Sequence, residues 1–162
     1  MDGKLRMMTA TYITDKDRML MLYRVGSRVV APSYCGVGGH FEKEELNDAR
    51  TCALRELREE IGLEESDLVG FTMRYVTLRL KNGEIRQNYY FFAGLAPGVK
   101  ITDDCAEGRL EWVPIDRVTE KNMPHTAYYM LKHYLETGRY TDTLYGGVTV
   151  NDAVVFTPLE EF

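Results

Sequence analysis

The amino-acid sequence predicts a single domain of the α/β (α+β) class, built around one mixed β-sheet that is covered by helices. The chain has 162 residues, of which 44% are hydrophobic and 28% charged, so it can form one hydrophobic core and has an ordinary globular composition. Strand-like and helix-like segments alternate along it without a strict repeat, which favours a mixed sheet. We expect residues 1–162 to form one domain.

The N-terminal part of the chain predicts two paired strands followed by a glycine-rich loop. Residues 6–14 and 19–25 are rich in strand-forming side chains, and the segment 15–17 between them is typical of a turn. Gly36, Gly38 and Gly39 then mark a loop whose backbone must bend or come close to another group.

The clearest helix of the sequence is predicted over residues 47–61. Asn47 or Asp48 can cap its start, and Gly62 suits a left-handed C-terminal cap. Small and aliphatic side chains recur every four residues from Ala49 to Ile61, which gives the helix one apolar stripe. This stripe predicts that the helix packs on a face of the sheet.

The C-terminal half predicts further strands and a second helix. Residues 69–80 and 84–95 are strand-like, and the Asn-Gly pair within 81–83 favours a hairpin turn between them. A short strand is expected at 110–113, a helix at 124–137, and a hairpin within 145–156.

Composition argues against several classes of protein. The formal net charge is −5 and no dense Lys/Arg cluster occurs, so a nucleic acid polymer is not an expected partner. The cysteines, Cys35, Cys52 and Cys105, are too widely spaced for a zinc site or a disulfide framework. Residues 1–8 lack the apolar core of a signal peptide, and the apolar runs are too short to span a bilayer. We therefore expect a cytoplasmic protein without membrane association.

The second half of the predicted helix carries an unusual set of carboxylates. On a helical wheel Glu56, Glu59 and Glu60 fall within an arc of roughly 100°, beside the apolar stripe, whereas Arg55 and Arg58 point to the far side. Such a run can be a plain solvated face. Near the core edge, however, two carboxylates about 5 Å apart repel by roughly 3 kcal/mol at an effective dielectric constant near 20. A hard cation such as Mg²⁺ would neutralise them.

The same segment resembles the signature of the Nudix family, G-x5-E-x7-R-E-U-x-E-E-x-G-U, in which U is a bulky aliphatic residue. The last nine positions, Arg55 to Leu63, match throughout, and Gly38-Gly39 resembles the paired glycines that open the signature. Glu45 keeps the first spacing from Gly39, but two extra residues precede Arg55. Glu45 is therefore our choice for the first signature glutamate, with the alternatives Glu42, Glu44 and Asn47.

A second segment resembles the MutT branch of that family. In that branch a loop glutamate is followed by glycine and, shortly afterwards, by Glu-Trp. Residues 106–112 of this chain contain Glu107-Gly108 and Glu111-Trp112 in this arrangement. The resemblance implies that Glu107 belongs to the active site.

The resemblance implies an α/β/α sandwich and a hydrolase that uses Mg²⁺, with Mn²⁺ as a possible substitute. It would cleave a phosphoanhydride bond of a nucleoside diphosphate-linked small molecule, and the MutT branch indicates an oxidised or ordinary purine nucleoside triphosphate, cleaved to the monophosphate and pyrophosphate. The implied metal ligands are oxygens of one glycine and four glutamates: Gly38, Glu56, Glu59, Glu60 and Glu107.

Other roles also follow from the resemblance. Glu56 or Glu107 would be the base that activates water, and Arg55 would pair with a loop glutamate and orient the helix, with Glu45 in a supporting role. Arg24 and Gly39 are candidates for contact with the substrate phosphates. By residue type alone, Gln87 and Asn88 are candidates for recognition of the base.

Three alternatives stay open at this point. The chain could hydrolyse ADP-ribose or another nucleoside diphosphate derivative, or it could be a nucleotide-sensing module without turnover; the complete set Glu56, Glu59 and Glu60 favours an enzyme. It could also be an isoprenoid diphosphate isomerase, which would need Cys35 or Cys105 in the pocket. The oligomeric state is left open.

Overall fold

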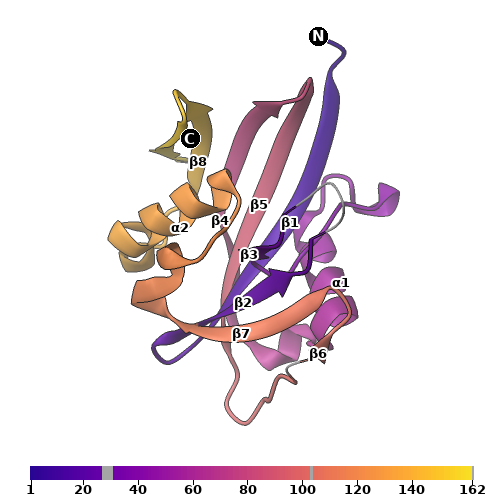
Figure 1. The fold of residues 1–162 in the computed structure, drawn as a ribbon, viewed down its shortest axis with the longest axis vertical. Coiled ribbons are helices and arrows are strands. Elements are labelled where there is room, and N and C mark those ends of the chain that lie inside the picture. The colour runs from indigo at the N-terminus through magenta and orange to yellow at the C-terminus, as the bar shows by residue number, and fades with distance from the viewer. Residues whose placement is uncertain (27–30, 103, 162) are drawn as a thin grey trace.

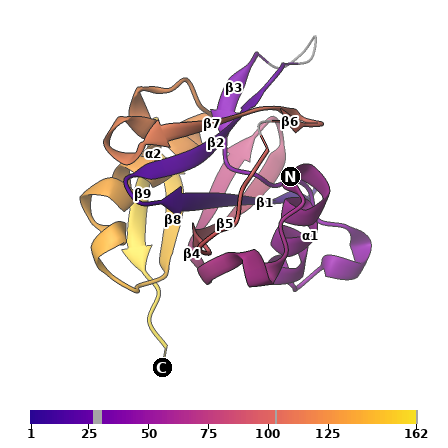
Figure 2. The same ribbon diagram turned by 90° about the horizontal axis from the view of Figure 1, so that it is seen from below.

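The computed structural model describes residues 1–26, 31–102 and 104–161 of the chain. In these residues a mixed sheet lies between two α-helices, α1 (Ala49–Ile61) and α2 (His125–Glu136). Seen from below, the two helices lie on opposite sides of the sheet (Figure 2). The fold class predicted from the sequence is therefore confirmed.

The described strands form one sheet in the order β6-β7-β2-β1-β5-β4-β8-β9, with the short β3 beside β2. The pairs β1–β5 and β4–β8 are parallel and the other pairs antiparallel. The strand bounds are β1 Lys4–Asp15, β2 Arg18–Arg24, β3 Ser33–Cys35, β4 Leu68–Lys81, β5 Glu84–Leu95, β6 Asp104–Cys105, β7 Gly108–Pro114, β8 Tyr145–Val150 and β9 Ala153–Pro158. Short 3-10 turns occur at Lys43–Glu45, Glu65–Asp67, Ile115–Glu120 and Gly138–Tyr140.

Helix α1 begins and ends as its capping residues dictate. The carboxylate of Asp48 accepts a hydrogen bond from the backbone N–H of Thr51 at 3.0 Å, which satisfies a free donor of the first turn. Gly62 has a left-handed φ of 70° and its N–H donates to the carbonyl of Arg58. Asn47 has φ 73°, so the predicted start at Asn47 was too early and the helix starts after Asp48.

The hairpin between β4 and β5 follows from its turn residues. Asn82 and Gly83 both have positive φ, 53° and 75°, as an Asn-Gly turn of the hairpin type requires. The two strands are long, and with β1 they extend well past α1 towards the end of the molecule that carries the N-terminus (Figure 1).

The core is divided by the sheet into two parts. Helix α1 packs Ala53 and Leu57 against one face, next to Leu20 and Phe91. Helix α2 packs on the other face in a cluster rich in aromatic side chains, which includes Tyr12, Tyr75 and Phe92. No described helix is both long and apolar enough to cross a membrane.

Candidate active site

The glycine loop lies directly on strand β1. The Thr11 N–H donates to the Val37 carbonyl at 2.7 Å, and the Thr9 N–H donates to the Gly39 carbonyl at 2.9 Å. A Cβ on Gly38 would lie 2.2 Å from the Thr9 carbonyl oxygen, so only glycine permits this approach. The loop is thereby held against β1 over the middle of α1.

Gly39 leaves room for a carboxylate of helix α1. A Cβ at this position would lie 2.6 Å from Oε1 and 2.8 Å from Oε2 of Glu56. The Glu56 side chain therefore packs against the bare backbone of the loop and is buried there. The glycine pair and the helix form one unit.

Arg55 gathers three glutamates around its guanidinium. Its Nε and Nη2 donate to the two carboxylate oxygens of Glu45 at 2.5 and 3.0 Å, and its Nη1 donates to Glu56 at 2.9 Å and Glu59 at 3.0 Å. Nη2 also donates to the carbonyl of His40. The placement of Arg55 on the far side of the helix was wrong, because its long side chain folds back over the helix towards the loop.

The two extra residues before the helix are absorbed in the turn that carries Glu45. Lys43–Glu45 forms a single 3-10 turn, in which the Glu42 N–H donates to Glu45 Oε2 at 2.9 Å. Glu45 is buried, whereas the alternative Glu42 is exposed and lies 3.9 Å from Arg55. The pairing with Arg55 holds the pKa of the Glu45 carboxyl below its usual range.

A second arginine joins four separate segments. Arg24, at the end of β2, donates from Nη2 to the Gly38 carbonyl at 2.5 Å and to Glu60 at 3.0 Å. Its Nη1 donates to Glu107 at 3.1 Å, and its Nε donates to the Cys35 thiol at 3.3 Å. The structure thus brings the predicted groups of Gly38, Glu60 and Glu107 together around a side-chain cation.

Burial raises the pKa of two of the helix carboxylates, Glu56 and Glu60. The Glu60 side chain is 7% exposed, and this burial raises its pKa to about 7 although Arg24 opposes the shift; Glu56 and Glu107 add repulsion. Burial likewise raises the pKa of Glu56, with Arg55 opposing the shift. One oxygen of Glu60, Oε2, is buried and has no hydrogen-bond partner among the described residues.

These residues fit a hard divalent cation. Among the described residues no three acidic, histidine or cysteine side chains converge at metal-binding distance, because the carboxylates are drawn apart onto the two guanidiniums. Yet the unpartnered Glu60 oxygen, the Gly38 carbonyl and the neighbouring Glu107 carboxylate are oxygen donors of the kind that Mg²⁺ prefers.

Not every predicted residue faces Arg24. The Glu59 side chain is 57% exposed and pairs with Arg55, so it lies at the rim of the site. Glu107 is 51% exposed and enters the site only through Arg24. Gln87 and Asn88 lie near the start of β5, where they are in register with Met7 and Met8 of β1. Neither is among the described residues that contact Arg24.

Cys35 is a neighbour of the site that the sequence did not assign to it. It lies on β3, a three-residue strand missing from the predicted elements, and its thiol contacts Arg24. Burial raises the pKa of this thiol, so it stays protonated at neutral pH.

The chain is similar to known proteins both in sequence and in fold. The family model of the NUDIX domain matches residues 4–134. A MutT protein from Bacillus halodurans has a similar structure, with a TM-score of 0.69 and 22% identity over 94% of this chain and 97% of that one. The ORF135 protein of E. coli gives 0.67 and 20% over 86% and 96%, and a MutT protein from Methanosarcina mazei Go1 gives 0.63 and 17% over 88% and 99%. At these identities the likeness to the solved structures is one of fold.

Proposed function

Because this chain belongs to the Nudix family of pyrophosphohydrolases, whose domain spans residues 4–134, we propose that it hydrolyses a nucleoside triphosphate to the monophosphate and pyrophosphate with Mg²⁺. The observation that carries the proposal is the arrangement around Arg24. Oxygens of Gly38, Glu60 and Glu107, from three separate segments, surround one positive group. An acidic chain needs bridging cations or a local basic group to accept a polyphosphate, and this site offers oxygen donors for the first and Arg24 for the second.

The residues that would hold the metal are Gly38, Glu56, Glu59, Glu60 and Glu107. These residues would hold Mg²⁺, which would supply charge neutralisation and Lewis-acid chemistry for the phosphates. Phosphoryl transfer needs little covalent help from the protein, and positioning and charge neutralisation carry most of the catalysis.

In this proposal Arg24 has different binding partners before and after the cation binds. Without the cation it is held by Glu60 and Glu107 at 3.0 and 3.1 Å. If a cation neutralised these carboxylates instead, the Arg24 guanidinium would be free to donate to an oxygen of the substrate phosphates. Arg24 would then bind the substrate rather than the protein.

Glu56 is the residue we propose as the general base. Burial against the Gly39 backbone raises its pKa, which brings the carboxylate closer to the proton affinity that a base at neutral pH needs. Arg55 is a positioning residue, because its Nη1 holds Glu56 Oε1 at 2.9 Å while Glu45 holds the other side of the guanidinium. Glu107, on a more exposed loop, is the alternative base.

The substrate class follows from two features. The segment Glu107 to Trp112 resembles the MutT branch, and the solved structures of similar fold include proteins named MutT. We therefore infer that purine deoxynucleoside triphosphates, oxidised ones among them, are the preferred substrates.

The test is a comparison of kcat/KM for 8-oxo-dGTP, dGTP, ATP, ADP-ribose and a dinucleoside polyphosphate under one Mg²⁺ condition. We expect a triphosphate to lead, with pyrophosphate as the released product. A lead of ADP-ribose or the dinucleoside polyphosphate by about tenfold, equal to ~1.4 kcal/mol of transition-state preference, would reject the triphosphate assignment. Binding of these nucleotides without release of any product would instead identify a sensing module.

A further inference from the structure

One face of the sheet is left bare where β1, β4 and β5 extend past α1. Register partners in a sheet project on the same side, so Leu5 of β1 and Leu80 of β4, which both pair with Ile85 of β5, share a face. The same face continues onto β8, where Val148 pairs with Leu78. We call this surface the apolar face; its exposed side chains are Leu5, Leu78, Leu80, Val148, Val150 and Val155.

The opposite face of the same strands is charged. Arg6, Arg79 and Arg86 lie in one row across β1, β4 and β5, with Glu84 beside Arg6 and Arg86. Successive side chains of a strand point to opposite faces of its sheet, so a sheet with one side in water has polar side chains on that side and apolar ones on the other. Here the apolar side is not covered by any described element, and its six side chains are therefore 39–63% exposed.

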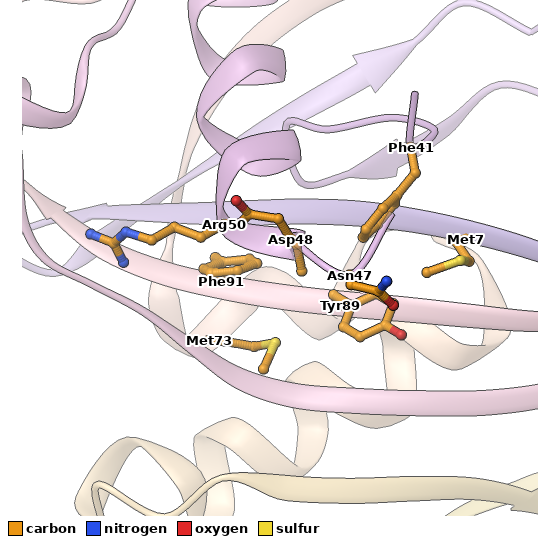
Figure 3. Close-up of a pocket in the computed structure, with 9 residues that line it drawn as sticks. Met7, Phe41, Asn47, Asp48, Arg50, Met73, Tyr89 and Phe91 are labelled. Atoms are coloured by element: carbon orange, nitrogen blue, oxygen red, sulfur yellow. The ribbon is translucent and has the colours of Figure 1, made fainter. Parts of the chain in front are cut away.

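A cavity of about 550 Å³ forms one end of the apolar face. It lies between the first turn of α1 and the sheet, and Figure 3 shows Met7, Met73, Tyr89 and Phe91 around it, with Phe41 on the loop side. Met7 is two residues along β1 from Leu5, so the cavity and the apolar face are continuous. At the other end, Leu5 and Leu80 stand on the tips of the extended strands.

We propose that the apolar face is the interface of a homodimer, in which two copies of this chain pack sheet against sheet about a two-fold axis. A two-fold axis through the middle of the face would bring Leu5 and Leu80 of each copy onto the cavity of the other, because such an interface pairs each patch with its own counterpart. Sheets pack face to face about 10 Å apart in this manner.

A second copy suits this surface better than a charged partner. The six side chains carry no charge, and the cavity adds only Asp48 and Arg50, which are of opposite sign, so no net charge opposes contact at this point. Their exposed area is on the order of 500 Å², near the upper end of what monomers leave open, and the cavity walls bring it towards the ~800 Å² per partner of a standard interface.

The dimer would leave the proposed active site open. Arg24 and Glu107 lie at β2 and next to β7, on one side of the strand order, whereas the apolar face extends from β1 to β9 on the other. Association and hydrolysis can therefore be measured independently.

Sedimentation equilibrium of the full chain tests the proposal, with thermal unfolding and pyrophosphate release as checks of folding. At about 10 µM we expect twice the mass of one chain for the wild type. The double variant Leu78→Glu, Leu80→Glu should have the mass of one chain and still unfold cooperatively. The matched control Arg79→Glu, Lys81→Glu alters the neighbouring residues on the opposite face and should stay dimeric, although it gains more negative charge.

Three outcomes would overturn the proposal. They are a wild type that stays monomeric up to about 100 µM, a Leu78→Glu, Leu80→Glu variant that stays dimeric, and a control that dissociates as readily as that variant. If the leucine pair fails to fold, Val148→Glu on β8 serves as the second interface variant and is read against Thr149→Glu.

Discussion

Two arginines determine where the carboxylates of the site lie. Arg55 binds Glu45, Glu56 and Glu59, and Arg24 binds Glu60 and reaches Glu107. The first arrangement is fixed, because Glu45 is buried and Arg55 is its one ion-pair partner within the described part of the chain. The second is suited to exchange, because a metal ion can take the place of one guanidinium among the same oxygens.

Arg24 should therefore compete with Mg²⁺ for its own carboxylates. We predict that Arg24→Met binds Mg²⁺ about tenfold more tightly than the wild type, since the guanidinium that competes for Glu60 and Glu107 is removed. The kcat/KM for the nucleotide should fall by about ten- to a hundredfold, because a charge-assisted contact to the phosphates is lost. Isothermal titration with Mg²⁺ and steady-state kinetics measure the two effects.

Arg58→Met is the matched control for this variant. Arg58 lies on the same helix as the carboxylates, but it pairs with the exposed Glu64 away from the site. It should change neither quantity by more than about twofold, as is usual for a surface residue. Weaker or unchanged Mg²⁺ binding in Arg24→Met would contradict the competition.

At this scale the sequence identified the candidate groups but not their division. The spacing of the signature indicated Glu45 and the three helix glutamates, and the Glu-Gly…Glu-Trp segment indicated Glu107. Which arginine binds which carboxylate depends on the conformation of long side chains such as that of Arg55, which folds back over the helix. A helical wheel gives only the direction in which each side chain leaves the helix. The sequence did not assign Cys35 to the site because its contact with Arg24 depends on the pairing of β2 with β3.

At the scale of elements, the glycine loop and helix α1 act as one unit. The loop is tied to β1 by the Thr9 and Thr11 hydrogen bonds, and its bare backbone at Gly39 forms the wall against which Glu56 rests. A helix alone could not fix the position of this carboxylate, because glutamate has three rotatable bonds. The loop removes that freedom.

Gly39→Ala should disturb this unit without unfolding it. The new Cβ would lie 2.6–2.8 Å from the Glu56 carboxylate, which must then move. Since a displacement of about 1 Å in a catalytic group can cost on the order of a hundredfold, we predict a drop of ten- to a hundredfold in kcat. Circular dichroism and the unfolding temperature should stay close to the wild type.

Gly94→Ala is the corresponding control. It lies on β5, where a Cβ would meet its nearest atom at an ordinary 3.6 Å, so activity should be retained. If Gly39→Ala were fully active, or if Gly94→Ala lost as much activity as Gly39→Ala, the packing of Glu56 against the Gly39 backbone would not matter for catalysis.

The predictability of the elements depended on their length and periodicity. Helix α1, the β4–β5 hairpin and helix α2 have strong periodic or turn signals, and the structure has them within one or two residues of the expected bounds. Strands β3 and β6, of three and two residues, carry no periodicity and owe their existence to pairing with β2 and β7. The early helix start at Asn47 failed because that residue adopts a left-handed φ of 73°.

At the scale of the whole molecule, the strand order separates the candidate active site from the apolar face. The strands on the β2 and β7 side carry the carboxylate site, and the strands from β1 to β9 carry the apolar face. Strand order across the sheet depends on long-range pairing, so sequence patterns alone did not reveal that the six side chains of the apolar face form one surface. The rule that strands alternate identified each side chain's face only once the register was known.

Metal binding should stabilise the whole fold. The buried Glu60, with a pKa raised to about 7 and an unpartnered oxygen, makes the cation-free protein less stable than it could be. A ligand that binds only the folded state at a hundred times its dissociation constant adds about 2.7 kcal/mol. For a chain of this size we therefore predict that Mg²⁺ raises the unfolding temperature by roughly 5–11 °C.

The double variant Glu59→Gln, Glu60→Gln should lose this rise, because two of the proposed ligands lose their charge, while Glu64→Gln, beyond the end of the helix, should keep it. Differential scanning fluorimetry with and without a chelator measures the shift in the absence of substrate, so it is independent of turnover. A wild type that shows no shift with Mg²⁺ or Mn²⁺ would reject the metal site at the helix carboxylates. A clear shift combined with no release of pyrophosphate from any nucleotide would retain the site and reject the hydrolase, and these two outcomes separate the binding chemistry of Glu60 and its neighbours from the catalysis proposed for Glu56.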